Sequence, residues 1–411
     1  MSFNSDELQA PEWVNSDFLK KVLEYNGDLE NVTIDDYQIS AATALGDHFA
    51  SIMFRVKITF STQEHPSETR SIIIKTSPFV EGFKKDILDK TNIDHFATEI
   101  FMYSKVLAEC GQILKKAGYN DLLAPKMIYQ STQPHEVIVF EDLRELGYFM
   151  FPKTIPNEAD TELIFSKLGR YHASVFRLAS EDHKDFHRKG GIFNAGAIEN
   201  LNFLREGFVF FKELVGTLPG FEIASEKLEK LEFDKIVEKC KQSVNSSGSY
   251  ELLNHGDYHI KNMMFKGQNE TEVSEVVLVD FQVSHWGSPA FDLVYMSAVI
   301  PPRMRMRAYH HYFDTFIDVL KKSDYNGVLP TFELLQKDLK SYRHLDLFFL
   351  ATLTPLLCAD KDEINEQVEV LLQSSNHLKK FYKAANYISY VKELLPVLLQ
   401  EGIIDGLIDS N

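Results

Sequence analysis

The most informative part of the sequence is the stretch NHGDYHIKNMMF at residues 254–265, which places Asp257 and Asn262 between two apolar segments. A second stretch, VVLVDFQ at residues 276–282, is an apolar run that predicts a buried strand ending at Asp280. Burying a charge without a partner is costly, so a strand of this kind seldom ends in a carboxylate without a reason. We therefore consider Asp257, Asn262 and Asp280 together as one candidate site.

Two carboxylates and an amide in this order suit the transfer of a phosphoryl group. Such a reaction needs a carboxylate that holds the attacking hydroxyl, and hard oxygen ligands that hold Mg2+ against the nucleotide phosphates. Protein-kinase-like loops use a carboxylate, an amide and a second carboxylate in the same order. Taken alone, Asp257 and Asn262 would also fit a loop stabilised by local Asx hydrogen bonds. Asp280, 18 residues after Asn262, favours the catalytic interpretation.

The charge of the chain narrows the partners that it can have. Lys and Arg number 43 and Asp and Glu number 60 among the 411 residues, which gives a net charge of −17. This acidic balance would repel a phosphate backbone, so we do not expect nucleic acid as a partner. A phosphate-bearing ligand would need local cations or a metal ion. Hydrophobic residues at 44% and charged residues at 25% are ordinary for a globular protein and exclude wholesale disorder.

The cysteines and the apolar segments indicate where the protein is expected to reside. Cys110, Cys240 and Cys358 lie far apart, which suits neither a close-spaced metal motif nor a disulfide framework. The N-terminal segment is polar and acidic, and no basic region leads into an apolar one. The longest apolar stretch, 347–359, is shorter than the roughly 20 residues that a bilayer requires. We expect a cytoplasmic protein that does not insert into membranes.

Hydrophobic periodicity predicts a sheet in the first third of the chain. Residues 52–60 alternate between apolar and polar side chains, which predicts a half-buried strand. Shorter runs predict further strands at 37–44, 71–75, 126–130 and 136–140, and a helix at 93–101.

After residue 141 the pattern becomes mainly helical. Helices are expected at 161–178, 200–214, 290–299, 305–321, 331–358 and 377–400, with strand-like runs at 250–253, 263–266 and 275–281. The fold class is therefore predicted to be α+β with two lobes. A small antiparallel-sheet lobe with one helix, 1–141, would precede a large, mainly helical lobe, 142–411, with the junction near 141–147.

Further motifs accompany the first two stretches at compatible spacing. They are VFEDL at 139–143, LGRYHAS at 168–174 and GSPAFDL at 287–293. Together, these landmarks resemble the aminoglycoside-phosphotransferase and choline-kinase group of protein-kinase-like folds. More specifically, the chain resembles the insect ecdysteroid-kinase-like family, also described as CHK kinase-like. The resemblance runs from about residue 29 to the final helices, and five ordered landmarks make it more specific than HGD alone.

The resemblance implies a role for each matching residue. Asp257 would be the catalytic base that orients or deprotonates the acceptor hydroxyl, and Asn262 and Asp280 would be Mg2+ ligands. Lys75 would hold the α- and β-phosphates of ATP, with Glu99 as its ion-pair partner. The remaining matches are Gly46 in a phosphate-covering loop at 46–51, the adenine-binding hinge residues Phe140, Glu141, Asp142 and Leu143, and Asp292 as a brace of the catalytic loop.

Some of these positions also fit ordinary structural roles. Lys75 could be a plain strand-end lysine, and Glu99 lies beside the apolar stripe of its helix, where a solvated glutamate would also fit. The phosphate-covering loop has a single glycine. His259 stands where the family often has Trp, and Lys261 stands where it often has Asn. These two changes could reshape the mouth of the pocket, or Lys261 could meet a phosphate.

On this basis we expect an ATP- and Mg2+-dependent small-molecule O-phosphotransferase. By resemblance, the acceptor would be an ecdysteroid or a similar apolar steroid or xenobiotic alcohol, which suits a role in detoxification. The alternative is a non-catalytic nucleotide- or lipophile-binding protein, a pseudokinase or carrier with the same fold. The hydrolase signatures Gly-x-Ser-x-Gly and His-Glu-x-x-His are missing. A peptide acceptor is not expected, because the segment between Asp280 and Asp292 is too short to form a peptide platform.

Overall fold

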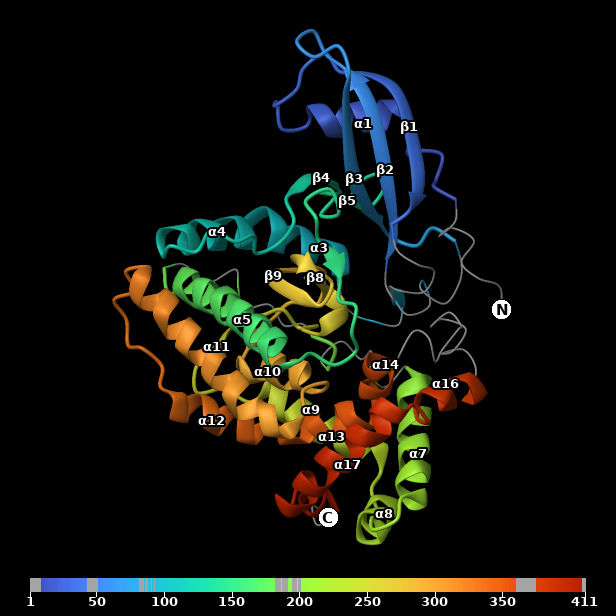
Figure 1. Cartoon of the computed structure of the whole chain (residues 1–411), viewed down its shortest axis with the longest axis vertical. Coiled ribbons are helices and arrows are strands. Elements are labelled where there is room, and N and C mark those ends of the chain that lie inside the picture. The colour runs from blue at the N-terminus through green and yellow to red at the C-terminus, as the bar shows by residue number, and fades with distance from the viewer. Residues whose placement is uncertain are drawn as a thin grey trace.

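A five-stranded antiparallel sheet forms the N-terminal lobe (Figure 1). The computed structural model describes residues 9–42, 51–80, 93–181, 201–359 and 375–408, together with 85, 88–89, 91, 186, 191–193 and 198. The strands lie in the order β1 (Thr33–Ala41), β2 (Ile52–Ser61), β3 (Glu68–Thr76), β5 (Val137–Glu141) and β4 (Met127–Ser131). The alternation predicted for β2 is confirmed, because Ile52 and every second residue up to Phe60 are buried.

Helices pack on both faces of this sheet. On one face, Leu19 of α1 (Ser16–Glu24) packs with Phe54 and the other buried side chains of β2. On the other face, Phe96 and Val106 belong to the same core as Phe140. They come from a continuous helical segment made of α3 (His95–Phe101), the π-helical turn η2 (Met102–Val106) and α4 (Leu107–Lys116). The sequence predicted one helix in this lobe. α1 was missed, although Asn15 caps its N-terminus by accepting a hydrogen bond from the backbone of Phe18.

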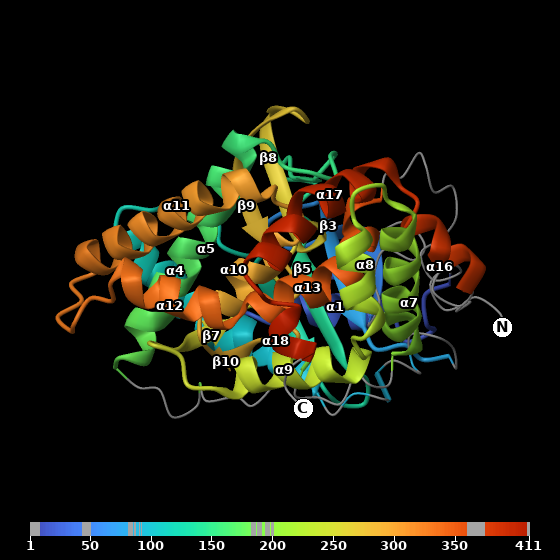
Figure 2. The same cartoon turned by 90° about the horizontal axis from the view of Figure 1, so that it is seen from below.

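The C-terminal lobe is mainly helical and contains two small sheets. β7 (Leu252–Asn254) pairs with β10 (His285–Gly287), and β8 (Met263–Asn269) lies between β6 (Phe149–Met150) and β9 (Glu272–Leu278). Among its helices are α5 (Glu158–Ala179), α7 (Asn202–Thr217), α8 (Glu222–Glu229), α9 (Phe233–Asn245), α10 (Ala290–Ser297), α11 (Pro302–Lys322) and α18 (Asp405–Ile408). Figure 2 shows α10 and α13 near the middle of this lobe, with α11 on one side and α7 on the other. Within the described ranges, no helix combines the length and apolar character that a membrane span needs.

The prediction of one long helix at 331–358 is wrong. The structure has three helices there, α12 (Phe332–Ser341), α13 (Arg343–Thr352) and α14 (Thr354–Cys358). Pro355 lies in the first turn of α14, where its missing N–H is not needed, and its ring would clash inside a continuous helix. The helix predicted at 377–400 is likewise divided into α16 (Ser375–Phe381) and α17 (Ala385–Gln400). The helical character of these segments was predicted correctly, but the breaks between the helices were not.

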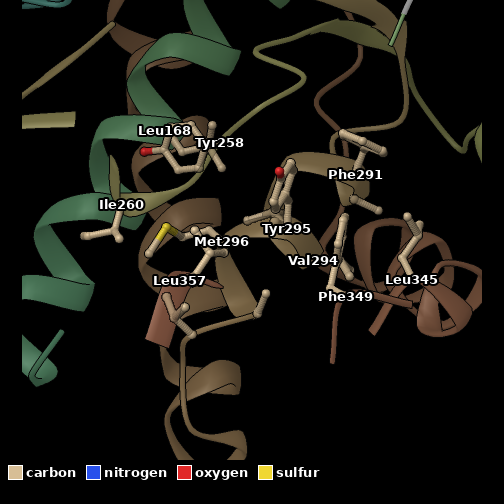
Figure 3. Close-up of a cluster of buried hydrophobic side chains, with 14 of the residues drawn as sticks. Leu168, Tyr258, Ile260, Phe291, Val294, Tyr295, Met296, Leu345, Phe349 and Leu357 are labelled. Atoms are coloured by element: carbon tan, nitrogen blue, oxygen red, sulfur yellow. The ribbon is translucent and has the colours of Figure 1, made fainter. Parts of the chain in front are cut away.

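In the C-terminal lobe, α5 and α11 pack closely against each other. A Cβ atom on Gly169 would lie 2.5 Å from the main-chain oxygen of Tyr312, so only glycine permits this approach. Figure 3 shows Leu168 of α5 beside Tyr258, and Tyr295 and Met296 of α10 close by. The hydroxyl of Tyr258 donates to the main-chain oxygen of Ile164 at 2.8 Å, which ties the loop after β7 to this core.

The predicted α+β class with two lobes is confirmed by this arrangement. The sheet-rich part ends at Glu141, the last residue of β5, and the mainly helical part follows. We propose residues 142–147, a run of tight turns, as the junction between the lobes.

Candidate active site

Lys75 lies at the centre of a buried ion cluster where the two lobes meet. It is on β3, flanked by Met53 of β2 and Ile138 of β5. Its Nζ atom is 2.5 Å from Oε2 of Glu99 on α3 and 2.7 Å from Oδ1 of Asp280. The side chains of Lys75 and Glu99 are only 4% and 2% exposed, so Glu99 is not a solvated helix residue.

The charges of this cluster favour a cation-binding site. Burial by itself would lower the pKa of Lys75, but the carboxylates of Asp280 and Glu99 outweigh burial and raise it. Burial raises the pKa of Glu99 to about 7, against the opposing effect of Lys75. Two carboxylates therefore share a single ammonium group. When all three groups are ionised, the cluster has an excess negative charge that a nearby divalent cation would balance.

Asp257 lies in the loop that follows β7, with its carboxylate held by several donors. Nδ2 of Asn262 donates to its Oδ2 at 2.8 Å and to its main-chain oxygen at 3.0 Å. Nε2 of His259 is 3.3 Å from its Oδ1, and the hydroxyl of Tyr295 also donates to the carboxylate. Burial by itself would raise the pKa of Asp257, but His259, Tyr295 and His255 outweigh burial and lower it to about 2. Asp257 is therefore ionised at neutral pH and can accept a hydrogen bond from a hydroxyl.

Asp292 braces the backbone of this loop, as the sequence predicted from its motif. Its carboxylate accepts from the backbone N–H of His255 at 2.7 Å and of Gly256 at 2.9 Å, and Nε2 of His172 lies 3.0 Å away. Gly256 has a φ of +85°, and a Cβ atom there would lie 2.2 Å from the main-chain oxygen of Val283. The loop therefore needs glycine at this position.

Asp280 follows β9 and has an unusual backbone conformation. Its φ is +68°, in the left-handed region that non-glycine residues seldom adopt. The backbone N–H of Val279, the residue before it, donates to the main-chain oxygen of Asn262 at 3.1 Å. Nε2 of Gln282 donates to Oδ2 of Asp280 at 3.2 Å. Strained backbone of this kind often occurs at functional sites, and here it accompanies the placement of Asp280 beside the loop that contains Asp257.

The chemistry of Asn262 and Asp280 suits a hard cation such as Mg2+. Because Nδ2 of Asn262 is engaged with Asp257, its amide oxygen is the atom that can bind a metal. Asp280 adds carboxylate oxygens to this set. Within the part of the chain that the structure describes, no group of three His, Cys, Asp or Glu side chains could hold a metal ion. Mg2+ usually takes one or two protein oxygens and completes its coordination with phosphates and water, so Asn262 and Asp280 would be enough to hold it.

A cleft of about 760 Å3 opens beside the ion cluster. The four predicted hinge residues, Phe140, Glu141, Asp142 and Leu143, all line it. Sequence reasoning missed its apolar walls, which include Ala42, Met53, Ile73, Tyr103, Met264 and Val279. Most of these apolar positions follow ordinary strand periodicity, so no sequence signal distinguishes them from core residues. Gly46 and the rest of the predicted phosphate-covering loop, up to residue 50, lie outside the described residues.

Within the hinge, Asp142 serves to hold the sheet. Its Oδ2 accepts from Nε of Arg55 on β2 at 2.6 Å and from Oγ of Ser71 on β3 at 2.7 Å. Burial by itself would raise the pKa of Asp142, but the hydrogen bonds from Arg55 and Ser71 outweigh burial and lower it. The side chain of Asp142 is thus engaged with the sheet, although Asp142 also lines the cleft.

A second pocket, of about 930 Å3, opens at Asp257. Its polar residues are Asp257, His259, Lys261 and Tyr295. The remaining lining is apolar and comes mainly from α7, α13, α14 and their flanking segments: Ile192, Ile198, Leu201, Phe203, Leu204, Phe348, Leu353, Leu356 and Leu357. Of the phenylalanines at 203–221, Phe203 alone lines this pocket. Most of these residues are far apart in the sequence, so the pocket could not be read from it.

The two cavities meet at Lys261, which lines both of them. Its Nζ atom donates to the main-chain oxygen of Leu356 on α14 at 3.1 Å. The site thus has a cleft lined by Lys75, Asp280 and residues 140–143, and beside it an apolar pocket with the carboxylate of Asp257 at its opening. This is the layout of a small-molecule phosphotransferase with a kinase-like fold.

Comparison with protein families agrees with this class. The model of the ecdysteroid kinase-like family matches residues 45–326, so the chain belongs to that family. Membership indicates a small-molecule phosphotransferase. A search of curated proteins finds no significant match.

Solved structures with a similar arrangement are distant. An ethanolamine kinase of Plasmodium vivax shares 15% identity at a TM-score of 0.37, with 96% of this chain and 91% of that chain covered. A macrolide 2′-phosphotransferase of Brachybacterium faecium shares 13% identity at a TM-score of 0.35, with 84% and 94% covered. An aminoglycoside phosphotransferase in a ternary complex with ADP and hygromycin B shares 9% identity at a TM-score of 0.34, with 96% and 98% covered. At such low scores, we draw no conclusion about the site from these likenesses.

Proposed function

We propose that the protein is an ATP- and Mg2+-dependent O-phosphotransferase that transfers the γ-phosphate of ATP to a hydroxyl of an apolar small molecule. The observation that carries this proposal is the apolar pocket of about 930 Å3 that opens at Asp257, directly beside the cleft that contains Lys75 and Asp280. A nucleotide in the cleft and an alcohol in the pocket would meet at the border that Lys261 lines.

Each residue of the site has a role in this reaction. Asp257, ionised at neutral pH, accepts a hydrogen bond from the acceptor hydroxyl and orients its oxygen toward the γ-phosphate. Lys75, held in place by Glu99, neutralises charge on the α- and β-phosphates. Asn262 and Asp280 would hold Mg2+, which when bound screens the phosphate charges. The positive charges of Lys75 and Mg2+ would also offset the repulsion between the acidic chain and the phosphate groups of the ligand.

The lining of the pocket supports an uncharged and largely apolar acceptor. Among the described residues around the pocket, Asp257 is the single carboxylate. A cationic substrate could therefore pair with one negative charge, and we assign that carboxylate to catalysis. Apolar walls of this kind favour flat or bulky hydrocarbon frameworks. We therefore propose an ecdysteroid or a similar steroid or xenobiotic alcohol as acceptor. A cytoplasmic role in detoxification is the corresponding physiological hypothesis.

A screen of hydroxylated molecules with ATP and Mg2+ tests this function. Steroid and xenobiotic alcohols are expected to stimulate ADP formation and to gain one phosphate, as seen by mass spectrometry. Polycationic aminoglycosides serve as a matched set of hydroxylated compounds that should stimulate little. Tight steroid binding with no ADP formation would instead favour the alternative function, a non-catalytic lipophile-binding protein or carrier.

Placing a charge in the wall of the apolar pocket is expected to weaken acceptor binding. Phe203→Asp should raise the KM of an apolar acceptor by about tenfold or more, since burying an unpaired carboxylate costs more than the roughly 1.4 kcal/mol that tenfold represents. The KM of ATP should change little, because Phe203 does not line the nucleotide cleft. Val209→Asp on the same helix is the control, since Val209 is 47% exposed. Equal KM values of the acceptor for Phe203→Asp and Val209→Asp would mean that the acceptor binds elsewhere.

A further inference from the structure

His259 connects the acceptor pocket to the carboxylate of Asp257. It precedes the short helical turn η3 (Ile260–Asn262), and its side chain is 14% exposed where it lines the pocket. One ring nitrogen, Nδ1, accepts from the backbone N–H of Lys261 at 3.2 Å. The other, Nε2, is 3.3 Å from Oδ1 of Asp257.

These two contacts determine which nitrogen of the neutral ring bears the proton. A backbone N–H can only donate, so Nδ1 of His259 must accept and cannot carry a hydrogen. The hydrogen of the neutral imidazole is then on Nε2, which faces Asp257. Nε2 is also 3.4 Å from Nδ2 of Asn262, but two donors cannot bond to each other, so the carboxylate is the partner of both.

The carboxylate of Asp257 is thereby held on both oxygens. Asn262 donates to Oδ2 at 2.8 Å, and His259 faces Oδ1. The ring of His259 is itself supported, since it packs edge-on against Tyr295 with centroids 5.6 Å apart, and Tyr295 stacks on Phe349 at 4.4 Å (Figure 3). The terminal torsion of an aspartate is broad, so a carboxylate held on one oxygen alone can rotate. The hydroxyl of Tyr295 also donates to this carboxylate, and His259 adds the contact at Oδ1 that further limits its rotation.

We propose that His259 is a positioning residue for phosphoryl transfer, whose Nε2–H fixes the rotation of the Asp257 carboxylate so that a remaining lone pair points at the acceptor hydroxyl. This inference rests on the proposed function. Its physical basis is that an attacking oxygen misplaced by about 1 Å costs on the order of a hundredfold in rate. The role is distinct from acceptor binding, because the pocket has many apolar contacts that do not depend on the imidazole.

Two substitutions separate this role from a merely structural one. His259→Phe keeps an aromatic ring beside Tyr295 but removes the donor, and it is expected to lower kcat by about 30- to 100-fold. His259→Gln keeps a side-chain N–H of similar reach and is expected to recover kcat to within about fivefold of wild type. The KM values for ATP and acceptor and the melting temperature should change little in both variants. His65→Phe, at an exposed position in the β2–β3 turn, is the matched control.

An activity-independent measurement accompanies the kinetics. Nitrogen-15 NMR of the free protein, at a pH where the ring of His259 is neutral, should show its hydrogen on Nε2 and not on Nδ1. A ring protonated on Nδ1, or a His259→Phe variant with wild-type kcat, would overturn the positioning role. Wild-type protein that phosphorylates no alcohol would overturn the proposed function instead, so the two failures are distinguishable.

Discussion

Asp280→Ala is expected to lower kcat by on the order of a thousandfold or more while the protein stays folded. The substitution removes the carboxylate proposed to hold Mg2+, so phosphate charge would be neither screened nor oriented. The fold should survive, because Lys75 keeps its contact with Glu99 at 2.5 Å and the side chain of Asp280 is at the cleft, 13% exposed. Acceptor-dependent ADP formation measures the rate, and circular dichroism measures the fold.

The control for this experiment is Asp36→Ala, which removes an exposed carboxylate from β1. Asp280→Asn adds a useful intermediate, since an amide keeps one oxygen ligand and loses the charge. It should remain well below wild type and regain some activity at raised Mg2+ concentration. Unchanged ADP formation by Asp280→Ala would rule out the proposed phosphoryl transfer at this site.

Asp292→Ala is expected to destabilise the protein by about 3–5 kcal/mol, the cost of breaking a buried ionic and hydrogen-bonded group by removing one partner. The substitution would leave the buried N–H groups of His255 and Gly256 without their acceptor, together with Nε2 of His172. The loop containing Asp257 would then lose its anchor, so activity should also fall. Urea denaturation measures the free energy of unfolding.

The pKa of Asp292 also predicts how the stability of the fold depends on pH. Burial by itself would raise its pKa, but His172, His255 and the backbone of Gly256 outweigh burial and lower it. A carboxyl with a lowered pKa stabilises the fold above its unfolded value near 3.8, and this contribution is lost as the pH falls. As the pH falls below about 4, the free energy of unfolding should therefore decrease less for Asp292→Ala than for wild type. Asp314→Ala, at an exposed position of α11, is the control. Equal free energies of unfolding for Asp292→Ala and wild type would contradict the proposal that Asp292 braces the loop.

Secondary structure was predicted well where it depends on the spacing of side chains that are close in the sequence. The alternation at 52–60 became β2 because strand side chains point alternately to opposite faces of the sheet. The apolar run before Asp280 became the end of β9, where Val276, Val277 and Leu278 are all buried because both faces of the strand are covered. The prediction of one helix at 331–358 failed because apolar content does not show where a helix breaks, and the breaks at Tyr342 and Leu353 depend on what packs around them.

The site was predictable in its residue types but not in its shape. Asp257, Asn262 and Asp280 were proposed from motif order and Lys75 from the family resemblance, and the structure brings them to the same region. Lys75 and Asp280 make contact across 205 positions of sequence, which no local pattern contains. His259 appeared only as a departure from the family, and its contact with Asp257 emerged from the loop geometry.

The order of acids, amides and apolar runs along the chain was enough to propose a phosphotransferase of this class, because side-chain type and spacing carry that information. The apolar pocket beside Asp257 is lined by side chains from α7, α10, α13 and α14. Which of the many leucines and phenylalanines line it was decided only by the packing of these helices. A buried apolar residue has the same sequence signature in a solid core and in a pocket wall, so only tertiary structure could distinguish them.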